Sequence, residues 1–419
     1  MSVNQKRKVG QRAYCLLCHS RCTIMNRALC SRKMKERSHL NGMGYVYYYS
    51  KDILKPSSVA EMMKRLNIQS VRSWSHIPWV LKDEKTVNNN IADGFHRMYD
   101  ELLKAGVSQL VGMSHYWFYP SRFGVAGENS GIPLPSQQKG SDYQDFLDIY
   151  EQSWYTLVKE FPEVTDWETG NEFNHKEFLR PLNNAKEMYT LKERADICTD
   201  LMFRSARAIH SISSTAGIIM PGMAPIGERG TGVYATNIEV EYDGIIMTLE
   251  KIYENIKSGR FGSTNPRDFF DSICWHPYFA SQDNEGNWNW KVPDDNWVAL
   301  NQSVYDVAVK AGDDGVGCCL SEFGFSDGGD QKEDQELCEH ISEGFRLIKE
   351  KMPFVDTVHA YRFFDSMGYV TQDPDTYSFF TMKSGKLVGK QRAYALQKQY
   401  GGSGELFEHS DNNEKEMVP

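Results

Sequence analysis

Residues 166–174 of the chain read DWETGNEFN, and residues 318–327 read CCLSEFGFSD. In each stretch an apolar run typical of a buried strand gives way to a polar loop. A glutamate stands at the change, Glu172 in the first stretch and Glu322 in the second. Parallel strands end at one rim of a barrel, so two such glutamates can face one another there although they are distant in sequence. The elements around the two stretches therefore decide the fold.

From about residue 41 onward, predicted strands alternate with predicted helices. Short apolar runs mark the strands, and apolar positions three or four residues apart mark the helices. Strands are expected at residues 41–49, 70–74, 107–113, 164–168, 216–220, 269–275, 316–320 and 355–363. Helices are expected at residues 57–66, 90–105, 143–161, 185–210, 245–256, 297–311, 334–350 and 390–400. This alternation predicts parallel βαβ units that close into a (β/α)₈ TIM barrel with long βα loops.

The predicted barrel spans residues 39–402 as a single domain of the 419-residue chain, a length that suits a large α/β barrel with insertions. Residues 1–38 are basic and cysteine-rich and are expected to form an N-terminal extension, and residues 403–419 a polar tail. A loop rich in glycine and proline is predicted at residues 120–140, and a tryptophan-rich loop at residues 280–297. Both loops follow predicted strands, so we expect them at the same rim as the two glutamates.

The N-terminal extension contains a cysteine cluster, whose members are Cys15, Cys18, His19, Cys22 and Cys30. Thiolates and a histidine can bind zinc tetrahedrally, but the second ligand pair at zinc-finger spacing is absent. The spacing from Cys15 to His19 also matches a haem-attachment pattern formally, and no other feature of the sequence supports haem. The simplest interpretation is an extension with free cysteines, so we expect no metal and no organic cofactor.

Composition and charge narrow the possible partners and locations. The formal net charge is −9 and the pI about 5.7, which disfavours binding to nucleic-acid backbones. No apolar run reaches the ~18 residues of a membrane-spanning helix, so no membrane partner is expected. The odd count of nine cysteines and the lack of an apolar run near the N-terminus favour a cytoplasmic location. Secretion by another route stays open, and the oligomeric state is not readable from the sequence.

Two facing carboxyl groups at a barrel rim are suited to the cleavage of glycosidic bonds. The reaction needs a carboxylic acid that protonates the leaving oxygen and a carboxylate that acts at the anomeric carbon. Both protonation states must exist at the same pH, so the two environments must separate the pKa values of the two groups. A carboxyl separation of about 5–5.5 Å would give retention of configuration through a covalent intermediate.

Asn171-Glu172 after the fourth predicted strand and SEFG at residues 321–324 after the seventh resemble the paired signatures of the clan A glycoside hydrolases. The resemblance extends over residues 40–400 and rests on short motifs in strand order, not on continuous identity. It implies a retaining O-glycosyl hydrolase that cleaves β-linked glycosides by double displacement. Glu172 would be the acid/base and Glu322 the nucleophile, and Asn171 would hydrogen-bond the substrate 2-hydroxyl.

Further substrate-binding candidates stand near the ends of predicted strands, and they are Arg72, His115, His276, Tyr278, Trp288 and Phe363. By the same resemblance, Arg72 would keep the nucleophile ionised and His115 would bind the sugar. His276 and Tyr278 would contact the nucleophile or the sugar beside it. Trp288 belongs to the tryptophan-rich loop and is a candidate for stacking on the substrate.

The end of the eighth predicted strand departs from the clan pattern. Clan members usually carry a tryptophan there, beneath the sugar in the cleavage subsite, whereas this chain has YRFFD at residues 361–365. Phe363 or Phe364 is the candidate for that platform. The exact family, and with it the sugar, is unresolved.

Two other functions use the same residues or the same fold. A catalytically silent carbohydrate-binding barrel would bind sugar without releasing product, and the presence of both glutamates with Asn171 speaks against it. A transglycosylase would form the same intermediate but exclude water from it. The sequence leaves open the sugar and linkage and the choice between exo and endo action.

Overall fold

Eight parallel strands form a closed barrel in the computed structural model, which describes residues 39–115, 131–175, 178–182, 189–224, 244–282, 288–327, 334–366 and 377–408. The strands are β1 (Leu40–Tyr45), β2 (Ser70–Trp74), β5 (Gln109–Met113), β6 (Asp166–Glu168), β7 (Gly217–Ile219), β8 (Ser272–Cys274), β11 (Gly317–Phe323) and β12 (Thr357–Ala360). Their order around the barrel follows the sequence, and β12 pairs with β1 to close it. The predicted (β/α)₈ fold is confirmed.

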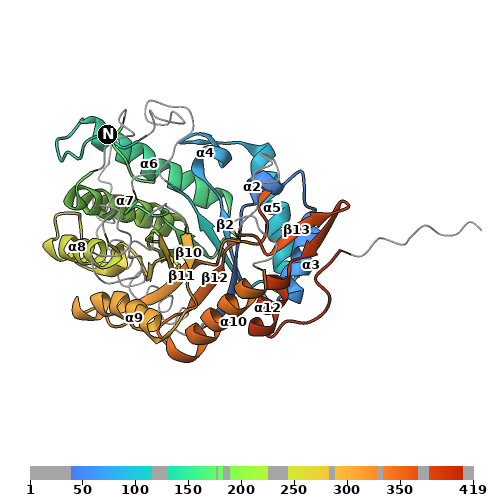
Figure 1. Ribbon diagram of the computed structural model, residues 1–419. Helices are drawn as coiled ribbons and strands as arrows, with labels where there is room; N and C mark the ends of the chain where they lie inside the picture. Colours follow the sequence, from blue (N-terminus) through green and yellow to red (C-terminus); the bar gives the residue numbers. More distant parts are fainter. Residues whose placement is uncertain are drawn as a thin grey trace, which may run out of the picture.

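A ring of helices surrounds the barrel (Figure 1). The helices that follow the successive barrel strands are α3 (Pro56–Arg65), α5 (Asn89–Lys104), α6 (Asp142–Glu160), α7 (Leu191–Ile212), α8 (Ile245–Ser258), α9 (Asp295–Lys310), α10 (Asp334–Lys351) and α12 (Gln391–Tyr400). The largest difference from the prediction is the start of α7, which was expected at residue 185. Thr190 and Glu193 form a reciprocal capping box, which satisfies free backbone N–H groups and begins the helix at Leu191.

The carboxyl ends of three strands differ from the prediction by three or more residues. β1 ends at Tyr45, and the short helix α2 (Tyr47–Ser50) takes up the rest of the aromatic run. β12 ends at Ala360 instead of residue 363. β11 continues to Phe323, so Glu322 belongs to the strand and does not follow it. The pairing of β11 with β12 shifts register between Leu320 and Phe323, which shows that this end of β11 is irregular.

Short elements in the loops were not predicted. Three antiparallel hairpins are formed by β3 (Leu81–Asp83) with β4 (Thr86–Val87), β9 (Ala280–Gln282) with β10 (Trp288–Trp290), and β13 (Phe380–Lys383) with β14 (Lys386–Gly389). The helix α4 (Ile77–Val80) and the 3-10 helix η1 (Pro266–Asp268) complete the described elements. These segments are too short for hydrophobic periodicity to reveal them.

Side-chain alternation along β6 separates the outer core from the barrel interior. Trp167 packs edge-on against Trp154 of α6, with ring centroids 5.7 Å apart, and both rings are fully buried. Its neighbour Glu168 must point to the opposite side of the strand, because successive strand residues face opposite ways. Glu168 is also fully buried, so β6 places a carboxylate inside the barrel.

The chain continues to pack on the barrel beyond residue 402, where the predicted domain ends. Ser403 donates its N–H to the Arg65 carbonyl, Leu406 is fully buried, and Phe407 forms a bridge with Val388. The described chain therefore packs on the barrel as far as residue 408. The remainder of the predicted tail, and the N-terminal extension with its cysteine cluster, lie outside the described residues.

Two further observations concern the described parts of the chain only. None of the helices there is long and apolar enough to cross a lipid bilayer. The cysteines there are free thiols, and they are Cys198, Cys274, Cys318, Cys319 and Cys338. Four of these five are buried, as expected for small apolar side chains in a core.

Replacement of Gly112 by alanine is expected to destabilise the barrel. A Cβ on Gly112 in β5 would lie 2.5 Å from the Trp167 ring, which is held in place by Trp154. The resulting overpacking should lower the free energy of unfolding by about 1–3 kcal/mol, measured by urea denaturation. Gly44→Ala is the matched control, because its Cβ would lie at an ordinary 3.5 Å from Tyr361. Equal stability of the two variants would contradict the packing argument.

Candidate active site

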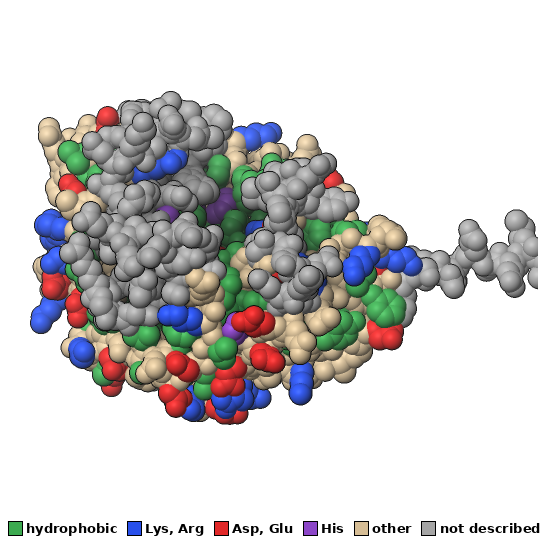
Figure 2. Space-filling view, in the orientation of Figure 1, with side chains coloured by type: hydrophobic (Ala, Val, Ile, Leu, Met, Phe, Trp, Pro, Cys, Tyr) green, Lys and Arg blue, Asp and Glu red, His purple; other side chains and the backbone are tan. Residues whose placement is uncertain are grey.

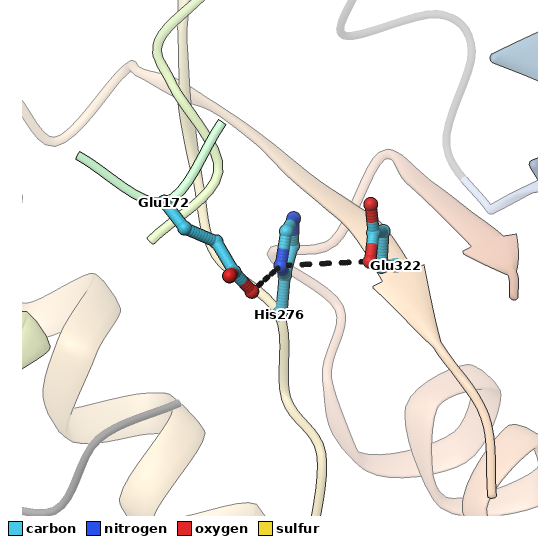
Figure 3. A group of neighbouring side chains, drawn as sticks. All are labelled: Glu172, His276 and Glu322. Carbon is cyan, nitrogen blue, oxygen red and sulfur yellow. Dashed lines mark hydrogen bonds and ion pairs between the residues drawn. The ribbon is translucent and has the colours of Figure 1, made fainter. Parts of the chain in front are cut away.

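Three side chains from separate strand ends meet at the carboxyl end of the barrel. Glu172 lies in the loop after β6, His276 in the loop after β8, and Glu322 near the end of β11. His276 Nδ1 is 2.8 Å from Glu172 Oε1 and 3.8 Å from Glu322 Oε2. Figure 3 shows the imidazole between the two carboxyl groups. One oxygen of each glutamate and the histidine nitrogen all lie within 4.8 Å of one another.

The face shown in Figure 2 is hollowed near its middle, and hydrophobic and histidine side chains are visible in the hollow. Glu172 and Glu322 keep 15% and 7% of their side-chain surface exposed, whereas His276 has none. Both carboxyl groups are therefore open to a ligand, and the histidine supports them from within.

The backbone around Glu172 is held in an uncommon conformation. Its φ is 48°, in the left-handed region that non-glycine residues seldom adopt. The Glu172 N–H donates to the Gly222 carbonyl at 2.6 Å, and Asn171 forms a bridge with Gly222. The loop after β7 thus fixes the turn that presents Glu172.

Only glycine fits at residue 222. A Cβ there would lie 2.3 Å from His276 Nε2 and 2.8 Å from Ser321 Oγ. The close approach of this backbone lets the loops after β7 and β8 and the end of β11 meet around one imidazole.

Arg72 on β2 is a fully buried cation that contacts two glutamates. Its Nη1 donates to Glu322 Oε1 at 2.6 Å, and its Nε donates to Glu168 Oε2 at 2.5 Å. Its Nη2 donates to Glu168 Oε1 at 3.1 Å and to Asn171 Oδ1 at 2.9 Å. Burial alone would lower the pKa of the Arg72 guanidinium, but the charges of Glu168 and Glu322 raise it above the ordinary value.

The surroundings of Glu322 favour its ionised form. Burial acting alone would raise the pKa of this carboxyl, yet the charges of His276 and Arg72 hold it below the usual value. The Tyr278 hydroxyl donates to Glu322 Oε2 at 3.1 Å and acts in the same direction. Both oxygens of Glu322 therefore accept a hydrogen bond, one from Arg72 and one from Tyr278.

The surroundings of Glu172 favour its protonated form. Burial raises the pKa of Glu172, and the negative charge of Glu322 raises it further against the opposing effect of His276. Burial would lower the pKa of His276, but Glu322 and Glu172 raise it to about 9. The two glutamates thus have pKa values that are shifted apart, as an acid and a nucleophile require.

Charge balance gives the same assignment. With Glu168 and Glu322 ionised, Arg72 and His276 protonated and Glu172 neutral, two negative charges meet two positive charges. An ionised Glu172 would leave one uncompensated negative charge in a buried cluster, which is costly in a low-dielectric interior. Each hydrogen bond then has a donor: His276 donates to Glu172 and to Ser321, and Ser321 donates to Glu168.

The same three residues, Glu172, His276 and Glu322, carry atom types that bind divalent metals. Arg72 already donates to Glu322 at 2.6 Å, and its charge opposes a second cation at that carboxylate. This set of side chains is therefore better suited to sharing a proton than to binding a metal ion.

The structure brings five predicted residues together with Glu322 in this cluster, namely Arg72, Asn171, Glu172, His276 and Tyr278. His115 lies to one side. Its ring packs against Phe173 and Phe178 at 5.2 and 5.9 Å, and burial keeps its pKa well below the ordinary value, so the ring is neutral. Its predicted contact with a sugar remains a prediction.

Phe363 does not offer the predicted platform. Its ring has no exposed surface and packs against Tyr45 at 5.4 Å and Phe380 at 4.4 Å, so no face of it is available for stacking. β12 ends at Ala360, three residues before the predicted end, and Tyr361, not Phe363, lies beside Tyr278. The side chain of Trp288 lies outside the described residues.

Aromatic residues outside the set of substrate-binding candidates surround Tyr278, although one of them, Trp290, belongs to the predicted tryptophan-rich loop. The ring of Tyr278 lies 6.2 Å from Trp290, 6.4 Å from Tyr361 and 6.1 Å from Tyr377. Trp290 comes from β10, Tyr361 follows β12, and Tyr377 precedes β13. Tyr361 stands within the quoted stretch YRFFD and was within reach of sequence reasoning, whereas nothing near Tyr377 marks it.

Glu168 and Ser321 are the polar residues of the cluster that sequence reasoning missed. Both stand inside the two stretches that carry Glu172 and Glu322. Strand alternation could have placed Glu168 in the barrel interior, because Trp167 beside it is a typical outward-facing core residue.

The sequence matches no protein-family model and no curated protein. Similar solved structures include a family 1 β-glucosidase from Thermotoga maritima, with a TM-score of 0.54 and 13% identity over 87% of this chain and 98% of that chain. The β-glucosidase from Thermotoga maritima in complex with methoxycarbonyl-substituted glucoimidazole has a TM-score of 0.53 and 14% identity over the same shares. The AHE enzyme from Alicyclobacillus herbarius has a TM-score of 0.54 and 12% identity, covering 87% of this chain and 97% of that chain. At these identities the likeness shows the barrel fold.

The pKa of His276 should depend on Glu322. A histidine whose pKa is about 9 stays protonated at neutral pH, and removal of the Glu322 charge should lower that pKa because the imidazolium loses an attractive partner. NMR titration of the wild type and of Glu322→Gln measures the difference. His96, which pairs with Glu160 and Glu163 at the surface, is the internal control and should titrate alike in both proteins. An unchanged His276 pKa in the variant would contradict the electrostatic account.

Proposed function

We propose that the protein is a retaining glycoside hydrolase that cleaves β-linked glycosides, with Glu322 as the nucleophile and Glu172 as the acid/base. The observation that carries the proposal is that these two glutamates lie on either side of His276. One oxygen of Glu172 is within 4.8 Å of one oxygen of Glu322. That proximity agrees with the short carboxyl separation of retaining enzymes, about 5–5.5 Å, and not with the wider gap that admits a water in inverting enzymes.

The direction of the two pKa shifts assigns the roles. Glu322 has a pKa below the ordinary value and is ionised, as a nucleophile must be. Glu172 has a pKa above the ordinary value and keeps its proton for the leaving oxygen. Reversal of the roles would require protonation of the carboxylate that Arg72 and Tyr278 bind.

The first step forms a glycosyl ester. A Glu322 oxygen attacks the anomeric carbon, the glycosidic C–O bond breaks, and the Glu172 proton passes to the departing oxygen. Esterification removes the negative charge of Glu322, which had raised the pKa of Glu172. The pKa of Glu172 therefore falls as the intermediate forms, and this change favours its role as base in the second step.

The second step hydrolyses the ester. Glu172 takes a proton from water, the water oxygen attacks the anomeric carbon, and the bond to Glu322 breaks. Glu172 is then protonated and Glu322 ionised, so the starting state is restored. Two inversions at the anomeric carbon give net retention.

The surroundings of the two glutamates suit a carbohydrate. Asn171 and Tyr278 bring polar groups beside the carboxyl pair, and Tyr361, Tyr377 and Trp290 add aromatic surface for the apolar faces of sugar rings. The resemblance to clan A and the β-glucosidase fold of similar structures agree with a glycosidase. The sugar and linkage are for a substrate panel to identify.

Replacement of Glu322 should abolish turnover without unfolding the protein. Glu322→Gln keeps the size of the side chain but lacks the nucleophilic charge, so kcat should fall at least ~1000-fold, equivalent to about 4 kcal/mol in activation free energy. The measurement is hydrolysis of a panel of aryl β-glucosides, galactosides, mannosides and xylosides. Full activity of this variant would overturn the assignment.

The same panel of glycosides distinguishes a hydrolase from the two alternatives, a silent binding barrel and a transglycosylase. A sugar-dependent rise in melting temperature of the wild type without product release would indicate a silent binding barrel. Product analysis in the presence of acceptor sugars would identify a transglycosylase by transfer that outcompetes hydrolysis.

Replacement of Glu172 should depend on the leaving group. Glu172→Gln cannot protonate the departing oxygen, so kcat should fall by about 10²–10⁴-fold for alkyl glycosides. For dinitrophenyl glycosides kcat should fall far less, because their leaving group departs without a proton. Wild-type activity should be lost at low pH as Glu322 is protonated, and at high pH as Glu172 loses its proton. The alkaline limb should be absent in Glu172→Gln with activated substrates. A leaving-group-independent loss would exclude Glu172 as the acid.

A further inference from the structure

Glu168 is a fully buried carboxylate that the proposed reaction does not use. Its two oxygens accept four hydrogen bonds: two from Arg72, one from Ser321 Oγ at 3.0 Å and one from the Gly222 N–H at 3.2 Å. No part of its side chain is exposed, so it does not touch substrate. A buried ionised carboxylate is energetically costly unless its hydrogen-bond donors stay in place. Glu168 in turn keeps those donors in position.

Two branches run from Glu168 to the two glutamates of the proposed reaction. One passes through Arg72, whose Nη1 donates to Glu322 Oε1 at 2.6 Å. The other passes through Ser321, whose Oγ lies 3.0 Å from His276 Nε2, and then through His276 Nδ1 to Glu172 Oε1 at 2.8 Å. The branches come from different strands and join at this carboxylate.

We propose that Glu168 is a positioning residue that orients both Glu322 and Glu172, through Arg72 on one side and through Ser321 and His276 on the other. This inference rests on the proposed function for its kinetic consequences. Its geometric part stands on the hydrogen bonds alone.

The hydrogen-bond pattern explains why a carboxylate is needed. An ionised carboxylate is an acceptor at every lone pair, and all four neighbouring groups are donors. A glutamine at this position would turn its NH₂ either toward Arg72 Nε or toward Arg72 Nη2, Ser321 and Gly222, so that donors would face each other in both cases. At least one branch would then shift, and a displacement of about 1 Å at a reacting group can cost about 100-fold in rate.

The charge of Glu168 acts on both branches in the same direction. Its loss would leave the Arg72 charge to act on Glu322 alone, which lowers the pKa of Glu322. Its loss would also remove a negative charge from the neighbourhood of His276 and Glu172, which lowers their pKa values. Both limbs of the pH profile should therefore move to lower pH.

Other titratable groups face this network but do not change charge near neutral pH. Burial and the Arg72 charge lower the pKa of His76 and of His359 on β12 to about 3. A hydrogen bond to Cys274 of β8 and burial keep the pKa of Cys319 well above the ordinary value. The shifts expected on removal of Glu168 therefore belong to Glu172, His276 and Glu322.

The test compares Glu168→Gln with Asp166→Asn in the full chain. Asp166 is a buried carboxylate on the same strand and the same side of it, and its Oδ2 accepts from Thr165 Oγ1. For Glu168→Gln we expect kcat to fall about 100-fold with little change in KM, and both pH limbs to move to lower pH. Asp166→Asn should leave both limbs unmoved. Unmoved limbs in Glu168→Gln, or equal shifts in the control, would overturn the proposal.

Ser321→Ala separates the two branches. It removes the link to His276 and leaves Arg72 on Glu168, so the alkaline limb should move while the acid limb, set by Glu322, stays. Glu168→Asp keeps the charge but shortens the reach, so kcat should fall about 10-fold with both limbs in place. If Glu168→Gln does not fold, these two variants decide, and wild-type kcat in both would overturn the proposal.

A measurement without substrate distinguishes this inference from the proposed function. In Glu168→Gln the pKa of His276, followed by NMR, should be lower than in the wild type, and in Asp166→Asn it should be unchanged. If the wild type hydrolyses no glycoside, the proposed function fails. The titration still tests whether Glu168 acts on His276. An unchanged His276 pKa in Glu168→Gln would overturn the inference whatever the activity.

Discussion

The buried guanidinium of Arg72 is the interaction on which the candidate site depends. It lies in the barrel interior with no exposed surface, so its charge must be neutralised within the protein. Glu168 and Glu322 supply that neutralisation from β6 and β11, and Asn171 adds a further acceptor. Because the three strands are fixed by the barrel, the ion pairs orient Glu322 without any contribution from a bound ligand.

Charge balance extends this constraint to the whole cluster. Each added carboxyl group in a buried site must be matched by a cation or carry its own proton. Arg72 and His276 match two carboxylates, and Glu172 is the carboxyl whose protonated form is favoured by its surroundings. The pKa values of Glu172 and Glu322 therefore shift in opposite directions for two reasons. One is the balance of buried charges, and the other is the contacts that each residue makes.

Much of the barrel and part of the site were predictable from local sequence. The strand at residues 70–74 was predicted with its observed bounds, and Glu172 and Glu322 were recognised because each stands where an apolar run ends. The failures were at positions where short-range pattern carries little information. Phe363 was chosen because the eighth strand was predicted to end there, but β12 ends at Ala360, Tyr361 lies beside Tyr278, and Phe363 is buried. The hairpin that carries Trp290 is too short to show periodicity.

The sequence by itself determined the alternation of strands and helices, the number of barrel strands, and the identity of two acidic residues at strand ends. Those features depend on neighbours within a few residues, which set burial and backbone conformation locally. Only the tertiary structure decided that Glu168 and Ser321 join Arg72 and His276 in one buried network, and that Tyr377 lies beside Tyr278. These contacts depend on barrel closure, on strand register and on the paths of loops from different strands, and no local pattern encodes them.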